Sequence, residues 1–253
     1  TTGGAAELID GFEVTDGGES EFESSVTLPD SLGRHAVATL YLHYANTGTI
    51  AMPAPLVVLE GSDDAFLTLD ESIVVAGFWS ASTPEGFSDR ITLLASGDTP
   101  GVLNPGESVT IPVYYAGLKK PWDFADTEIS FTRTHYLATN STVIDWDSFG
   151  EQLRPASLDA SKWTSVVANL QSIAGATVGE YVGALGQAAA FLGTYGDKVV
   201  NNRTLVAFLV QQAIGNNPFG DLIRLRDFDR KSPGMPLEWI RSYRGDLISR
   251  QNL

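Results

Sequence analysis

The chain of 253 residues contains no cysteine. This absence excludes a disulfide framework, a thiol nucleophile and a cysteine-based zinc site. A chain of this length without cysteine fits an exported bacterial protein, and it is also compatible with the cytosol. Apolar residues make up 43% of the sequence, which is enough for a packed core that needs no covalent support.

Positive charge is scarce in the first 150 residues, which contain five Lys or Arg against 22 Asp or Glu, a net charge of -17. Residues 151–253 contain 11 Lys or Arg and nine Asp or Glu, a net charge of +2. The acidic part repels phosphate backbones, so we expect no nucleic-acid partner. Its acids are typical of a solvated surface, and a cation-binding module is the alternative.

The sequence has no basic-then-apolar signal segment and no apolar run long enough to cross a membrane, so we expect no membrane insertion. It begins with Thr1-Thr2-Gly3-Gly4 in place of Met. We interpret this start as a linker or a cut end, and the chain as a fragment or processed product.

Histidine is also rare, with His35, His43 and His135 alone. His43 and His135 fall on expected strands, and their rings would be close if those strands paired. No His-x-His or His-Glu-x-x-His spacing supports a metal site, so two ordinary strand histidines are the alternative. The sequence also lacks a Gly-x-Ser-x-Gly elbow, a phosphate loop and a dinucleotide fingerprint. We therefore predict that the protein is not an enzyme.

Short runs rich in Val, Ile, Thr, Tyr and Phe predict strands between residues 22 and 137. In residues 37–44, apolar and polar positions alternate, with Leu40, Leu42 and Tyr44 on one face. Asn104-Pro105-Gly106-Glu107 places Pro and Gly at the centre of a type II turn. Strands and turns without intervening helices predict an Ig-like antiparallel β-sandwich.

Helical spacing replaces this pattern after Trp146 and predicts about three helices, which end near residues 175, 196 and 214. Thr177 and Glu180 have capping-box spacing. Gly179, Gly183 and Gly186 in the second helix predict close approach of another helix. A membrane helix of the Gly-x-x-x-Gly type is the alternative, and Glu180 argues against it.

The fold class that we predict is therefore α+β: a sandwich, a small helical unit and a C-terminal β-hairpin. Four segments follow from the pattern: an acidic lead-in (1–21), the sandwich (22–146), the helical unit (147–217) and a C-terminal β segment (218–253).

Two ligand sites are predicted from local composition. Asp16, Glu19 and Glu21 lie in a Gly-containing acidic stretch whose oxygens suit Ca²⁺, and a flexible acidic lead-in is the alternative. No other cofactor is expected. Exposed rings of Trp79, Phe87 and Trp122 would form a platform for carbohydrate, and burial at the end of the sandwich is the alternative.

The segment PGMPLEWIRSYRG near the end of the chain resembles the start of the shell in RHS/YD-repeat proteins, which are giant secreted bacterial proteins. The matching residues of this RHS-like motif are Gly234, Pro236, Leu237, Trp239, Arg241 and Tyr243. The stretches YANTG, MPAPLVVLEG and LNPGESVTIPVYY look like the Ig-like or CARDB-like modules of bacterial surface proteins.

The resemblance implies a structural or adhesive module, secreted or on the cell surface, that acts as a spacer or plug next to a YD-repeat shell. Its expected partners are neighbouring domains of the same or a larger polypeptide, with self-association or glycan binding as further possibilities. A carbohydrate-binding module is the alternative function.

Overall fold

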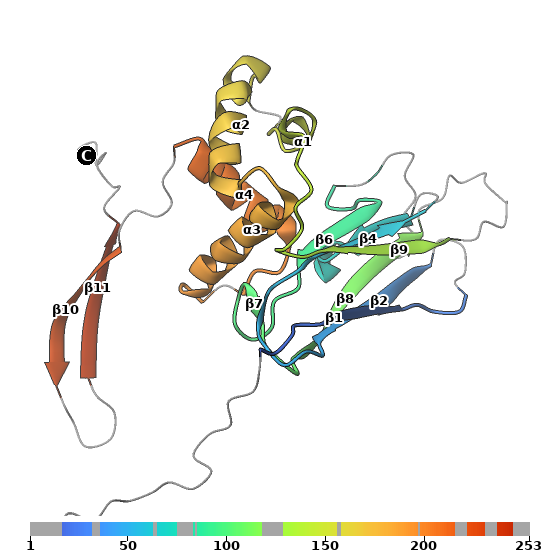
Figure 1. Cartoon of the computed structure of the whole chain (residues 1–253), viewed down its shortest axis with the longest axis horizontal. Helices are drawn as coiled ribbons and strands as arrows, with labels where there is room; N and C mark the ends of the chain where they lie inside the picture. The colour runs from blue at the N-terminus through green and yellow to red at the C-terminus, as the bar shows by residue number, and fades with distance from the viewer. Residues whose placement is uncertain are drawn as a thin grey trace, which may run out of the picture.

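The computed structural model combines β-sheets and helices in an α+β fold (Figure 1). It describes residues 17–31, 36–62, 65–74, 83, 85–117, 129–155, 158–196 and 198–215, and the backbone of residues 222–230 and 237–244. The described residues form several antiparallel sheets and four α-helices.

Two antiparallel sheets form the β part. The first has the order β1 (Phe22–Thr27), β2 (Val37–Asn46), β8 (Ser108–Gly117) and β5 (Ala65–Thr68). The second has the order β6 (Arg90–Leu94), β4 (Leu56–Gly61) and β9 (Phe131–Tyr136). The short strands β3 (Met52–Pro53) and β7 (Val102–Leu103) pair with each other, and the 3-10 turn η1 (Glu71–Ile73) follows β5.

The two larger sheets share one hydrophobic core, which makes them a sandwich. Leu42 and Val113 of the first sheet pack in the same cluster as Leu59 and Leu93 of the second. The alternation predicted for β2 is confirmed, because Leu40, Leu42 and Tyr44 are buried whereas Thr39 and Tyr41 are exposed. The core therefore follows from the period-two pattern of the strands.

The turn that precedes β8 has the predicted type II form. Gly106 has φ 74, and the Glu107 N–H donates to the Asn104 carbonyl at 3.1 Å. Glycine is required at this position because a positive φ is strained for other residues.

The helices are α1 (Trp146–Gln152), α2 (Ala160–Ala174), α3 (Val178–Gly193) and α4 (Asn202–Ala213). The last three agree with the sequence prediction, and α3 has the expected capping box between Thr177 and Glu180. Helix α2 ends at Gly175, which has φ 86. Helix α1 is an addition, begun by Asp145, whose carboxylate accepts from the Ser148 N–H at 3.3 Å. None of the described helices is both long and apolar enough to cross a membrane.

A second core cluster connects the helices to the sandwich. The buried side chains of Trp163, Leu185 and Leu205 belong to the same cluster as Leu56 of β4 and Leu94 of β6. The Leu94 N–H donates to the Val200 carbonyl at 2.8 Å. One core therefore crosses the predicted boundary at residue 146, although the division into four segments itself stays a prediction.

Gly179 and Gly186 of α3 lie against loops of the β part, so the helix partner that we expected at these glycines was wrong. A Cβ at Gly179 would collide with the Ala138 carbonyl, which follows β9. Gly186 lies against Gly101, and Gly183 has open space around it. The missing side chains let loops of the β part approach α3, because the helix packs on the sandwich and not only on its neighbouring helices.

The predicted C-terminal hairpin is present in the backbone of β10 (Leu222–Arg230) and β11 (Leu237–Arg244), which pair antiparallel. The register shifts between Arg226 and Phe228. Among the described strands, each of the two pairs with the other alone. Figure 1 draws this hairpin apart from the sandwich and the helices, at the left of the view.

Candidate functional site

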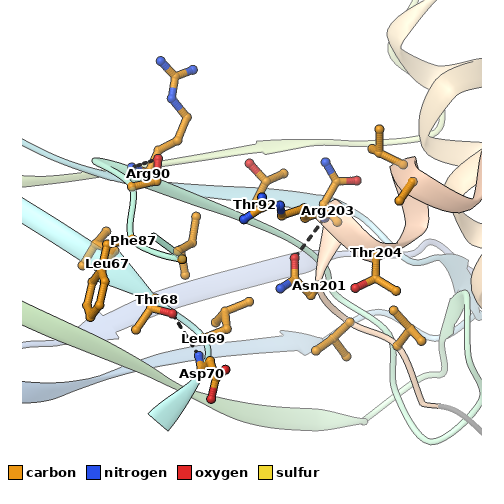
Figure 2. Close-up of a pocket in the computed structure, with 18 of the residues that line it drawn as sticks. Leu67, Thr68, Leu69, Asp70, Phe87, Arg90, Thr92, Asn201, Arg203 and Thr204 are labelled. Atoms are coloured by element: carbon orange, nitrogen blue, oxygen red, sulfur yellow. Dashed lines mark hydrogen bonds between the residues drawn. The ribbon is translucent and has the colours of Figure 1, made fainter. Parts of the chain in front are cut away.

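A groove of about 1370 Å³ lies between one side of the sandwich and the helices (Figure 2). Its sandwich wall consists of residues 67–70, Ile73 and residues 85–88. Ile91 of β6 and Ile111 of β8 also line it. The helical wall is formed by residues 152–153, Pro155, residues 198–204 and residues 206–207. The volume exceeds that of a typical small-molecule pocket, so the groove suits an extended ligand.

The sandwich wall is shaped by short-range hydrogen bonds just after β5. The Asp70 N–H donates to Thr68 Oγ1 at 3.1 Å. Asp70 Oδ1 accepts from the Ser72 N–H at 2.9 Å and from Ser72 Oγ at 2.6 Å. These bonds from Ser72 lower the pKa of Asp70 below its usual range. The Asp70 carboxylate therefore caps η1, and its Oδ1 already accepts two hydrogen bonds from Ser72.

The helical wall is fixed to the second sheet at the start of α4. Asn201 caps this helix, with Oδ1 accepting from the Arg203 N–H at 2.9 Å, and it forms an isolated bridge with Leu93 of β6. Figure 2 shows Asn201, Arg203 and Thr204 at this wall, with Thr68 and Asp70 on the sandwich side. The start of α4 is therefore fixed against β6, and this contact sets the position of the helical wall relative to the second sheet.

Three cationic side chains line the groove, although the protein carries a net charge of -15. Arg90 lies 4.0 Å from Glu60 and 3.8 Å from Asp89, and Figure 2 shows its side chain directed away from the other labelled residues. Lys198 Nζ lies 3.6 Å from Asp98. Arg203 has no carboxylate within ion-pair distance in the described part of the chain. It is the cation best placed to meet an anionic ligand.

Of the predicted aromatic platform, only Phe87 belongs to the described residues, whereas Trp79 and Trp122 lie outside them. Phe87 lines the groove but is only 8% exposed, and it packs in a small cluster with Phe66 and Ala116. Its ring therefore contributes mainly to packing. The carbohydrate platform stays a prediction.

The two strands that contain His43 and His135 do not pair with each other. His43 lies in β2 of the first sheet, whereas His135 lies in β9 of the second. The His43 ring hydrogen-bonds Thr27 Oγ1 at 3.0 Å and Thr110 Oγ1 at 2.8 Å, and the His135 ring lies 5.2 Å from the ring of Phe22. Each ring has its own partners because each sheet of the sandwich contributes one strand.

The calcium prediction is only partly covered by the described residues, since Asp16 lies outside them. The backbone of Glu19 and Glu21 is held by Thr49 and Thr47, whose N–H groups donate to their carbonyls at 2.7 and 2.9 Å. No three His, Asp or Glu side chains within the described ranges form a metal-binding group. Calcium binding at Asp16, Glu19 and Glu21 stays a prediction.

The RHS-like motif falls on β11 at alternate positions of the strand. Leu237, Trp239, Arg241 and Tyr243 pair with Arg230, Phe228, Leu225 and Ile223 of β10. Gly234 and Pro236 lie outside the described residues.

Sequence reasoning missed Asn46, whose buried amide connects three segments. Its Nδ2 donates to the carbonyls of Ile50 and Leu103 at 2.8 and 3.1 Å. Its Oδ1 accepts from the N–H groups of Glu21 and Gly48 at 3.3 and 3.0 Å. The only signal in the sequence was its place before Thr47-Gly48, which indicates a turn and not a buried network.

Comparisons with known proteins give no family. No family model matches the chain, and no curated protein matches it. The chain is similar to a solved structure of AvmM, which catalyses macrocyclization in alchivemycin A biosynthesis, at 14% identity and a TM-score of 0.26. That likeness covers 45% of this chain and 87% of the other. At this TM-score it supports no conclusion about fold or function.

Proposed function

We propose that this chain is a non-catalytic structural or adhesive module of a large secreted or surface-displayed bacterial protein. It acts as a spacer or plug next to a YD-repeat shell, and its C-terminal hairpin is the attachment element. The observation that carries this proposal is that β10 and β11 pair only with each other among the described strands, and that β11 contains four residues of the RHS-like motif.

A two-stranded sheet is marginally stable in water unless it gains further strands or a packing surface. Both outer edges of the hairpin have no strand partner among the described strands, and such edges recruit another strand. A neighbouring shell that supplies the next strand would complete the sheet. The family resemblance of the motif supports such a neighbour.

The shared core of sandwich and helices supports the spacer role, because it makes the two parts one mechanical unit. The finer fold that we propose is Ig-like. The order β1-β2-β8-β5 and the pairing of β4 with β9 correspond to the A-B-E-D and C-F arrangements of such sandwiches.

The non-catalytic role is tested with the purified protein and panels of glycoside and ester substrates. We expect no turnover. Turnover that a single change of an acid to its amide abolishes would contradict the proposal and identify an active site.

The alternative function, carbohydrate binding, is tested on a glycan array. Binding that is lost in Trp79→Ala or Trp122→Ala would favour the carbohydrate-binding module over the structural one. Exposed Tyr41→Ala in β2 is a suitable control, because it removes an exposed ring at a position that the prediction does not use.

A further inference from the structure

Strand β1 is an edge of the first sheet, and its outer side has no strand partner among the described strands. The sheet order places β1 at one end, with β2 on its inner side. The pairing continues before β1, because the N–H groups of Thr47 and Thr49 donate to the carbonyls of Glu21 and Glu19. An extended edge therefore runs from residue 19 to residue 27.

Alternate residues of this edge direct their backbone groups away from the inner side. The carbonyls of Glu19 and Glu21 accept on the inner side, and this direction alternates from residue to residue along an antiparallel strand. Phe22, Ser24 and Val26 therefore direct their N–H and C=O groups to the open side. Residues 19–27 contain no proline, so each of these groups is able to pair with an added strand.

Three exposed glutamates occupy positions between these residues. Glu23 lies opposite Ala45 on the outer face of the sheet, and Glu21 and Glu19 precede it at the same two-residue spacing. No ion pair within the described ranges includes any of the three. Strands β1, β2, β5 and β8 contain no Lys or Arg, so no cation of this sheet offsets the three carboxylates.

The charge and spacing of the glutamates define the chemistry of an added strand. Side chains that lie opposite each other on neighbouring strands interact directly, and opposite charges are favourable there. Carboxylates at every second position therefore match a strand with Lys or Arg at every second position. The first 16 residues of the chain itself contain four Asp or Glu and no Lys or Arg, so repulsion between like charges disfavours them as this strand.

From this arrangement we infer that the open edge of β1 binds an extended basic segment of a partner protein. The segment adds to β1 by backbone hydrogen bonds, as in other cases of strand addition. Its Lys or Arg side chains lie beside Glu19, Glu21 and Glu23, and its alternate apolar side chains lie beside the half-buried Phe22 and Val26. This inference does not depend on the proposed function of the hairpin.

The experiment measures binding of a fluorescein-labelled peptide of alternating lysine and valine to the full chain by fluorescence anisotropy. EDTA is present, so that no calcium ion competes for the carboxylates. We expect saturable binding. A peptide with glutamate in place of lysine should bind at least about tenfold more weakly, because like charges would then face each other. A peptide with alternate backbone nitrogens methylated should lose a similar factor, because it lacks the donors for strand pairing.

Charge variants of the protein test the role of the glutamates. Glu21→Lys should weaken binding of the basic peptide by about tenfold, because it replaces an attraction with a repulsion. Glu85→Lys is the matched control, since Glu85 is an exposed acid that lines the groove and lies outside β1. It changes the net charge of the protein equally, and its affinity for the peptide should stay within about twofold of that of the natural chain.

A proline variant tests the backbone of the edge. Ser24→Pro removes an N–H group on the open side and leaves the hydrogen bonds to β2 in place, so it should weaken binding by about tenfold. Ser24→Ala should bind as the natural chain does, because its backbone is unchanged. Thermal melts show whether each variant is folded, and the methylated peptide tests the same bonds without any change to the protein.

Three results would overturn the inference: no saturable binding of the basic peptide, equal binding of the methylated peptide, or equal losses in Glu21→Lys and Glu85→Lys. Self-association of the full chain that Glu21→Lys abolishes, without binding of the basic peptide, would also overturn it and would assign the edge of β1 to a second copy of the chain.

Discussion

Asn46 shows how much one buried polar side chain can hold together. It is 0% exposed, and its amide bonds the segments around Glu21, Ile50 and Leu103. Asn46→Ala removes these bonds and leaves buried backbone groups unpaired. We expect it to lower the free energy of unfolding by about 2–4 kcal/mol.

Urea denaturation of Asn46→Ala measures this loss, with Thr47→Ala as the control. Thr47 is the exposed neighbour, and its substitution should change the free energy of unfolding by no more than about 0.5 kcal/mol. Equal effects of the two substitutions would show that the buried amide is not the cause.

Glu107 makes stability depend on pH. Its carboxylate accepts from the N–H groups of Asn104 and Asp98 at 2.6 and 3.2 Å, and the Asn104 bond is the main cause of its lowered pKa. A lowered pKa in the folded state stabilises the protein above the ordinary value of 4.5, and this contribution is lost as the pH falls through the folded value. Glu107→Gln should therefore melt at a lower temperature than the natural chain at pH 7.

Thermal melts between pH 7 and pH 3 test this prediction. The gap in melting temperature between the two proteins should begin to close below about pH 4.5. A gap that is constant over this range would mean that ionisation of Glu107 does not contribute.

At the residue scale, the backbone conformation of a residue could be predicted from the sequence better than the burial of its side chain. The type II turn at Gly106 was predictable because proline and glycine restrict the backbone locally. The burial of Phe87 and of Asn46 was not, since both depend on segments distant in the sequence that pack around them.

At the element scale, Gly101 in the loop before β7 and Gly183 in α3 give opposite predictions. Gly101 has φ 81, and a Cβ there would collide with the Gly186 carbonyl. Gly183 lies inside α3 with nothing near its missing side chain. Gly101→Ala should destabilise by more than about 1 kcal/mol, and Gly183→Ala should stabilise by about 0.5–1 kcal/mol.

Urea denaturation of the two alanine variants measures both effects on the same scale. Destabilisation by Gly183→Ala would mean that α3 has a close partner at this position. Stability unchanged by Gly101→Ala would mean that the loop and the helix are not in tight contact.

The sequence predicted the helices that have strong local signals and missed the one that has none. The capping box of Thr177 and Glu180 and the stop at Gly175 are local, so α3 and the end of α2 were found. Helix α1 has only seven residues, too few for a helical period to appear. Its position is set by tertiary contacts, with Trp146 Nε1 donating to the Gly175 carbonyl at 2.9 Å.

For the whole molecule, the core shared by sandwich and helices predicts that the two parts unfold together. Leu94 of β6 is 0% exposed and packs in the cluster that includes the helices. Leu94→Ala should lower the free energy of unfolding by about 2–5 kcal/mol.

Native-state hydrogen exchange of Leu94→Ala shows where this loss is felt. The protection of backbone amides from exchange should fall by similar factors in β2 and in α2. Leu28→Ala is the control: the Leu28 side chain is 40% exposed, so this substitution should leave amide protection in both elements unchanged. Loss of protection in the sandwich alone would show that the helices fold independently.

The groove is a property of the whole molecule, and the sequence could not predict it. Its lining residues come from five stretches of the chain, within 67–73, 85–92, 111–112, 152–155 and 198–207, which no spacing rule brings together. It exists because β5 ends at Thr68 while β8 continues, and because α4 begins beside β6.

The attachment role of the hairpin is the central claim, and its apolar composition makes it testable. Seven large apolar residues lie in its two strands, namely Leu222, Ile223, Leu225, Phe228, Leu237, Trp239 and Ile240. Burial of each such side chain contributes about 1.5–3 kcal/mol. A hairpin with these residues, whose outer edges have no partner among the described strands, should pair with another copy when no neighbouring domain is supplied.

Light scattering of the full chain and of a chain truncated after Pro218 tests this claim most directly. The account predicts concentration-dependent self-association of the full chain and a monomer for the truncated one. A monodisperse monomer for the full chain, with the hairpin protected from protease, would contradict it, because the hairpin would then be satisfied within its own chain.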